Sequence, residues 1–116
     1  MQESSRPRRF GQVIGLDPAR LDEYRKYHDE IWPEITDALT AAGIRSYSIF
    51  YRDGQLFGTF EYVGPDEEFD ARMAALARAP RMREWWDIME PMQRPVEGRA
   101  AGEWWAALEE VFHFGG

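Results

Sequence analysis

The strongest constraint on the fold is a pair of strand-like runs, residues 44–52 and 55–63, separated only by Asp53–Gly54. Both runs are rich in aromatic and β-branched residues, which favour extended backbone. An Asp-Gly pair supplies the backbone conformation of a two-residue hairpin turn. The sequence therefore predicts an antiparallel β-hairpin, which ends where Gly64–Pro65 breaks the second strand.

A strand-like run at residues 9–16 is followed by a helical pattern. Asp17 suits the N-cap of a helix, and Pro18 suits its first position. Residues on one side of an amphipathic helix recur at spacings of three and four. They are Leu21, Tyr24, His28, Ile31, Ile35 and Leu39. Pro33 removes a backbone donor and crowds the preceding turn, so we expect a kink there, and Gly43 ends the helix.

The second half of the chain predicts two more helices, a loop and a last strand. The helices span residues 66–79 and 81–90, and the first begins with acidic residues that the helix dipole favours. Residues 91–102 are rich in Pro and Gly and have no periodicity, which indicates a loop. Residues 108–114 alternate as a strand. The residues predicted to share one face of it are Leu108, Glu110, Phe112 and Phe114.

The predicted order, strand–helix–strand–strand–helix–strand, is that of the ferredoxin-like (βαββαβ) α+β fold. Its four-stranded antiparallel sheet carries helices on one face, and in the dimeric α+β barrel type the bare face pairs with a second copy. The 116-residue chain is predicted to form one domain over residues 9–116, after a disordered lead-in at 1–8. A homodimer would use the 15% aromatic content, and the isolated last strand is a candidate for exchange between subunits.

Charge and composition exclude several classes of partner. A formal net charge of −7 argues against nucleic acid and against an anionic membrane surface. The absence of cysteine excludes disulfides and thiolate chemistry. No stretch has the length of a membrane span, and the charged amino terminus lacks the apolar core of a signal peptide. We therefore expect a cytoplasmic protein whose ligand is a neutral small molecule.

His28 is the leading candidate for a chemical group, and two interpretations of it remain open. A histidine on the apolar side of a helix is more often a hydrogen-bonded core or boundary residue. Tyr24, one turn earlier on the same face, and the kink at Pro33 favour a pocket wall instead. Near neutral pH an imidazole both gives and takes a proton, which is the property of a general acid–base.

Adjacent tryptophans, Trp85 and Trp86, are the second candidate feature. They diverge by about 100° around a helix, so they do not fill one core site together. One is expected to pack, and the other to reach a pocket or a partner, where an indole face stacks on a sugar or another apolar ring. Plain core and dimer packing is an equal alternative. Tyr47 becomes relevant only if its strand face looks toward His28.

Other chemical groups are predicted to be structural or absent. Glu110 is expected to anchor the last strand rather than to transfer protons. The two histidines, His28 and His113, form no metal-ligand spacing, and cysteine ligands are absent. The sequence has no Gly-rich phosphate loop and no GxSxG elbow. We therefore do not expect a transition-metal site.

Four stretches of the chain, in order, resemble the L-rhamnose mutarotases. They are YRKYHDEIWPEI at 24–35, YSIFYRDGQLFGTFEY at 47–62, EWWDIM at 84–89 and LEEVFHF at 108–114. The H-x-x-I-W-P-E run and the Trp-Trp pair are the most specific parts. The resemblance extends over nearly the whole domain and implies a dimeric ferredoxin-like fold.

The resemblance also implies an activity, the interconversion of the α and β anomers of L-rhamnose or a related 6-deoxy sugar, without metal or organic cofactor. Carried over by motif, His28 corresponds to the proton donor of the family. Tyr24 and Tyr47 correspond to its sugar-binding tyrosines, and Trp85 and Trp86 to its tryptophan pair at the sugar.

Two segments depart from the family pattern. The amino terminus is extended before the first strand, and residues 98–107, GRAAGEWWAA, have no counterpart that we match. The second segment contains Trp104 and Trp105. We expect these residues to alter a pocket lid or the dimer contact, and through it the choice of sugar. Two other functions remain as alternatives: a haem-binding or monooxygenase-type dimeric α+β barrel protein, and a non-catalytic dimeric binding module.

Overall fold

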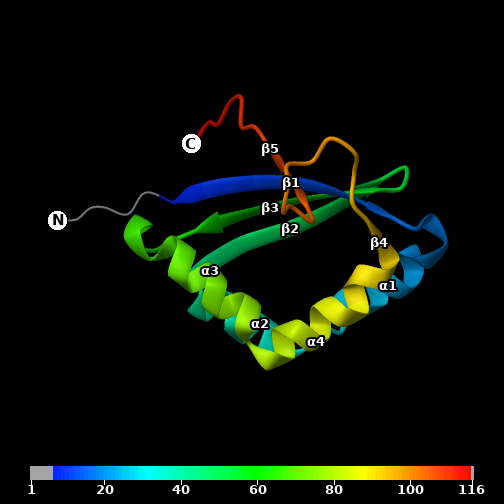
Figure 1. The fold of residues 1–116 in the computed structure, drawn as a ribbon, viewed down its shortest axis with the longest axis horizontal. Helices are drawn as coiled ribbons and strands as arrows, with labels where there is room; N and C mark the ends of the chain where they lie inside the picture. The colour runs from blue at the N-terminus through cyan, green and yellow to red at the C-terminus, as the bar shows by residue number, and fades with distance from the viewer. Residues whose placement is uncertain (1–6, 116) are drawn as a thin grey trace.

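The computed structural model describes residues 7–115, which form one sheet and two rows of helices (Figure 1). The strands are β1 (Arg8–Leu16), β2 (Ile44–Arg52), β3 (Gln55–Tyr62), β4 (Gln93–Arg94) and β5 (Ala106–Leu108). The α-helices are α1 (Leu21–Asp29), α2 (Pro33–Ala41), α3 (Phe69–Arg78) and α4 (Pro80–Met89). Short 3₁₀ turns are η1 (Pro18–Arg20), η2 (Asp66–Glu68) and η3 (Glu90–Met92).

The sheet is antiparallel, with β1 at its centre. β3 pairs along one side of β1, and β2 pairs outside β3. On the other side of β1, β4 pairs near its end and β5 pairs near its middle. These two short strands together occupy the place of the fourth strand of a ferredoxin-like sheet, so the predicted fold class is confirmed.

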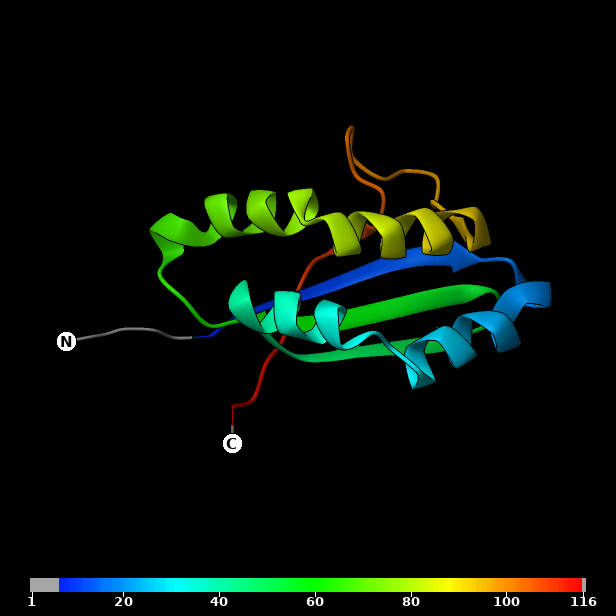
Figure 2. The ribbon, with the colours of Figure 1, turned by 90° about the horizontal axis from the view of Figure 1, so that it is seen from below.

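All four helices cover the same face of the sheet. In Figure 2 the α1–α2 row lies beside the α3–α4 row across the strands. The core lies between these helices and the inward side chains of the sheet. Its most buried members are Ile14, Leu16, Leu56, Tyr62 and Met92. None of the helices in residues 7–115 combines the length and the apolar character that crossing a membrane requires.

The first helical segment is divided at the proline. Asp17 accepts a hydrogen bond from the Ala19 amide at 3.0 Å and caps η1 rather than the α-helix itself. The helix then stops after Asp29 and restarts at Pro33, so the expected kink is a complete break. Gly43 follows α2 with a φ of +85°, which ends the helix as predicted.

The hairpin between β2 and β3 has the predicted turn, because Asp53 and Gly54 both have positive φ angles, of 49° and 82°. A bulge interrupts β2 between Arg45 and Ser48, with Ser46 at a φ of 53°. Two residues of β2 therefore oppose one of β3, and Tyr47 lands on the face that the helices cover.

The predicted loop at residues 91–102 contains a strand that sequence patterns did not show. Gln93 and Arg94 pair with Leu16 and Gly15 of β1. A Cβ atom at Gly15 would lie 2.6 Å from the Arg94 carbonyl oxygen, so only glycine permits this approach. Because β4 is held this closely, the Gln93 side chain is fixed on the helix-covered face beside Leu16.

The prediction of a last strand over residues 108–114 is wrong. Pairing with β1 ends at Leu108, and residues 109–115 form an irregular tail on the side of the sheet opposite the helices (Figure 1). Glu109 and Glu110 therefore follow the strand. Most of the predicted lead-in, residues 1–6, lies outside the described residues, and β1 begins at Arg8.

Candidate functional site

His28 lies half-buried on α1, on the side that faces α4. Its Nδ1 lies 2.8 Å from the Tyr24 carbonyl oxygen, which accepts only, so Nδ1 carries the proton of the neutral ring. The ring packs 4.5 Å from the Tyr24 ring and 5.2 Å from Trp85, measured between centroids. Among residues 7–115 no hydrogen bond reaches Nε2, which leaves that nitrogen able to accept a proton.

The environment of His28 favours its neutral form. Burial lowers the pKa of the imidazole below the ordinary value of 6.5, and the Tyr24 carbonyl and the Asp29 carboxylate oppose this only in part. At pH 7 the ring is therefore a base with a free nitrogen, which becomes an acid once it has taken a proton.

The lowered pKa predicts a pH dependence of folding. Between pH 6.5 and the pKa of the folded state, the unfolded chain binds more protons at His28 than the folded chain does. The contribution of this group to stability is thus complete above pH 6.5 and is lost as the pH falls through the folded pKa. Urea unfolding at pH 7 and pH 5 is expected to show a larger loss for the wild type than for His28→Gln. Equal losses of stability in the two proteins would contradict a lowered pKa of His28 in the folded state.

Trp85 and Trp86 take different positions on α4. Trp85 is 5% exposed and meets three rings edge-on: Tyr27 at 6.1 Å, His28 at 5.2 Å and Trp32 at 5.2 Å. Trp86 is half-buried and packs against the margin of the core. The structure therefore brings Trp85 to His28.

Tyr24 lies on α1, and Tyr47 lies on β2, on the face of the sheet that the helices cover. Burial raises the pKa of Tyr47 to about 12, with a smaller contribution from the neighbouring Tyr24, although 37% of Tyr47 stays exposed. Burial also raises the pKa of Tyr24. Both phenols therefore keep their protons at neutral pH and act as hydrogen-bond donors or acceptors without charge.

Two glutamine side chains hold these tyrosines, and sequence reasoning missed both roles. The Gln12 amide donates to the Tyr47 hydroxyl at 3.0 Å, and the Gln93 amide donates to the Tyr24 hydroxyl at 3.2 Å. Gln12 alternates with Phe10 and Ile14 along β1, and this spacing is the only signal in the sequence for the face on which it lies. Gln93 had none, because its position depends on the pairing of β4 with β1.

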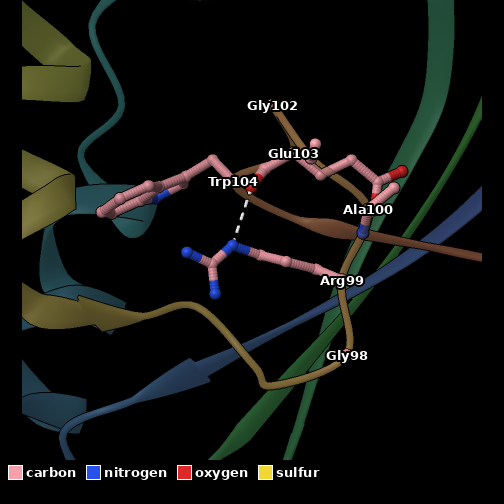
Figure 3. Close-up of a pocket in the computed structure, with 7 residues that line it drawn as sticks. Gly98, Arg99, Ala100, Gly102, Glu103 and Trp104 are labelled. Atoms are coloured by element: carbon pink, nitrogen blue, oxygen red, sulfur yellow. Dashed lines mark hydrogen bonds between the residues drawn. The ribbon is translucent and has the colours of Figure 1, made fainter.

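The loop between β4 and β5 encloses an open hollow of about 420 Å³, lined by Gly98 to Trp104 (Figure 3). The Arg99 side chain makes its hydrogen bonds within the same loop: it donates to the Glu103 carbonyl oxygen at 2.9 Å and to the Val96 carbonyl oxygen at 3.0 Å. The Trp104 indole points away from the loop and donates to Gln93 at 2.8 Å. The hollow is therefore a feature of the loop itself. Trp104 links this loop to Gln93 and, through Gln93, to Tyr24 beside His28.

Glu110 does not lie among the side chains around His28. Its carboxylate accepts from the Arg9 guanidinium at 2.9 Å and 3.3 Å, on the face of the sheet without helices. The predicted anchoring role agrees with this pair, although the partner is a side chain rather than a backbone amide. Within residues 7–115 no three His, Asp or Glu side chains gather in a way that would hold a metal ion.

Taken together, the described residues combine a neutral imidazole with a free nitrogen, two protonated phenols and an indole wall. Such a set is chemically able to exchange protons with an uncharged ligand that carries hydroxyl groups.

Comparison with known proteins points to one family. Residues 9–114 match the family described as L-rhamnose mutarotase. The L-rhamnose mutarotase of Burkholderia cenocepacia is 43% identical over 106 residues, which cover 84% of this chain and 89% of the relative. That of Lactiplantibacillus plantarum is 37% identical over 107 residues, covering 90% and 96%.

A solved structure agrees with these sequence matches. The crystal structure of the L-rhamnose mutarotase from Formosa agariphila superimposes with a TM-score of 0.69 and 28% identity, covering 92% of this chain and 98% of that one. The fold, the sequence matches and the resemblance of the motifs agree along nearly the whole length. The chain therefore belongs to the L-rhamnose mutarotase family.

Proposed function

We propose that the protein interconverts the α and β anomers of L-rhamnose or a related 6-deoxy sugar, with His28 as the proton-transfer group. The observation that carries this proposal is the imidazole itself. Its Nδ1 is held by the Tyr24 carbonyl, its Nε2 is free among the described residues, and its ring stands against Trp85. Membership of the family supports the reaction class.

Mutarotation opens the pyranose ring and closes it on the other face. Opening moves a proton from the anomeric hydroxyl and delivers one to the ring oxygen, and closure reverses both transfers. A neutral imidazole accepts the anomeric proton at Nε2, and the imidazolium that forms delivers this proton to the ring oxygen as the C–O bond breaks. Closure on the other face runs the same two transfers backwards, so the imidazole ends neutral. No electron, hydride or phosphoryl group moves, so the reaction requires no cofactor.

The aromatic and phenolic groups around His28 suit the recognition of an uncharged sugar. The Tyr24 and Tyr47 hydroxyls hydrogen-bond sugar hydroxyls, and the Trp85 and Trp86 indoles cover the methyl group and C–H faces. A sugar with a misplaced hydroxyl leaves one of these buried polar groups unpaired, which lowers its binding.

Saturation-transfer NMR on a panel of 6-deoxy sugars tests the proposal directly. The wild-type protein is expected to accelerate exchange between the two anomeric protons of L-rhamnose or of another member of the panel. Binding without acceleration would instead support a non-catalytic binding module. A Soret band on titration with haem, without acceleration, would support the haem-binding alternative.

We also propose that the protein is a homodimer in the cytoplasm, joined through the sheet face without helices. This face carries Phe50, 61% exposed, and Leu108, 45% exposed. The tail beyond it exposes Val111, Phe112 and Phe114 at 90%, 80% and 78%. An apolar face of this kind is typical of an interface, and exchange of the tail between subunits would bury its alternating side chains.

Two charges in the tail are expected to separate the dimer. The double substitution Phe112→Asp/Phe114→Asp places carboxylates where apolar contact with a second copy is proposed, so sedimentation velocity should show a monomer. Ala74→Asp/Ala75→Asp adds the same charge at exposed positions of α3 and should leave the dimer unchanged. A wild-type monomer, or a dimer that survives the tail substitutions, would contradict the proposed interface.

A further inference from the structure

We propose that Gln93 and Trp104 are positioning residues that set the direction of the Tyr24 hydrogen bond, so that its hydroxyl proton is presented to the sugar. This inference rests on the proposed function. It assigns a role to the loop between β4 and β5, which lies outside the motifs that resemble the family. It also gives a reason for Trp104, whose indole leaves its own loop to reach a side chain of another segment (Figure 3).

The direction follows from the chemistry of the three groups. An indole nitrogen donates and never accepts, so the atom of Gln93 that lies 2.8 Å from Trp104 Nε1 is its carbonyl oxygen, Oε1. The other end of the same amide is then Nε2, a donor, which lies 3.2 Å from the Tyr24 hydroxyl. Tyr24 must therefore accept from Gln93.

Accepting from Gln93 leaves the Tyr24 proton free for another acceptor. A phenol has one proton, and the bond from Gln93 uses one of its lone pairs. Among residues 7–115 no acceptor for that proton makes a hydrogen bond with Tyr24. Donors in a chain polarise one another, so the hydroxyl is a stronger donor than an isolated phenol. That proton is therefore available to an oxygen of a sugar bound beside His28.

The fold holds two members of this hydrogen-bond chain, Gln93 and Tyr24, in place. Gln93 is the first residue of β4, which is held to Leu16 of β1, and Tyr24 is 4% exposed on α1. Trp104 lies just before β5 and is 41% exposed, so the series of hydrogen bonds from Tyr24 through Gln93 ends at the protein surface. Loss of the indole N–H would free the amide of Gln93 to rotate and to present its oxygen to Tyr24.

The substitution Gln93→Glu reverses the direction of the hydrogen bond with the Tyr24 hydroxyl and changes the size of the side chain very little. The introduced carboxylate accepts from both Trp104 and Tyr24, so the phenol turns its proton away from the sugar. We expect KM for the preferred sugar to rise about 5- to 10-fold, the value of one hydrogen bond, with kcat within about twofold of wild type. Trp104→Phe keeps the ring, removes the N–H and should raise KM in the same direction.

Glu97→Gln is the matched control. It exchanges the same carboxylate and amide groups, in the opposite sense, at an exposed position of the loop between β4 and β5. KM is expected to stay at the wild-type value. In the Tyr24→Phe background, which lacks the hydroxyl, Gln93→Glu should add no further rise in KM, because the two changes act through one bond.

The hydrogen-bond chain is also visible without substrate. In ¹⁵N NMR spectra of the ligand-free protein, the Trp104 indole resonance should shift and exchange faster with water in Gln93→Met, whereas the Trp105 resonance should not. An active wild type whose Gln93→Glu and Trp104→Phe variants keep the wild-type KM would overturn the positioning role alone. A wild type that accelerates no anomer exchange would overturn the proposed function, and the role at the sugar with it.

Discussion

Replacing His28 with alanine is expected to reduce the acceleration of anomer exchange by about 10²–10⁴-fold, the usual contribution of general acid–base catalysis. The side chain is half-buried and its Nε2 is free, and among residues 7–115 no second imidazole lies near Tyr24 to replace it. The phenols have raised pKa values and are poor bases at neutral pH. Saturation-transfer NMR measures the loss as a reduced exchange rate at a fixed protein concentration.

The matched control is His113→Ala. His113 is exposed in the tail beside Glu110, on the other side of the sheet, so its removal should leave the exchange rate at the wild-type value. Circular dichroism and thermal unfolding establish that both variants are folded. A folded His28→Ala protein with wild-type activity would refute the assignment of the imidazole.

Replacing Trp85 with alanine is expected to lower the free energy of unfolding by about 3–5 kcal/mol, the range for removing a large buried aromatic side chain. Trp85 is 5% exposed and lies edge-on against rings from both α1 and the start of α2. Its loss leaves a cavity where α4 meets the broken helix. Urea denaturation monitored by far-UV circular dichroism gives the change from the shift in midpoint at constant slope.

Trp86→Ala is the comparison for this prediction. The same atoms are removed from the next position of α4, but Trp86 is only half-buried, so the loss of stability should be clearly smaller. Equal destabilisation by the two substitutions would show that Trp85 does not have the central packing role assigned to it.

Local signals in the sequence predicted most of the fold. Asp53–Gly54 specified the hairpin because few other residue pairs adopt its two positive φ angles. Pro33 and Gly43 marked the helix boundaries because each constrains the backbone at its own position. Tyr24 and His28 were placed together by their spacing of four on one helix, and the structure confirms that their rings pack.

The errors and omissions concern contacts between distant segments. The alternation of Leu108, Phe112 and Phe114 shows that one side of the segment suits burial, but it does not say against which chain. In this chain the edge of β1 accepts a partner strand only as far as Leu108. Gln93 was missed for the same reason, because its partners lie 69 and 11 residues away and no periodicity marks it.

Gly15 bears on how this protein can change by mutation. It has no side chain, yet any larger residue there would force the Arg94 backbone outward. Gln93, the neighbour of Arg94, would move with it and lose its reach to the phenol. Attempts to alter sugar preference by randomising the residues around His28 should therefore hold position 15 constant. A substitution at this position would displace Gln93 without changing any side chain that is proposed to bind the sugar.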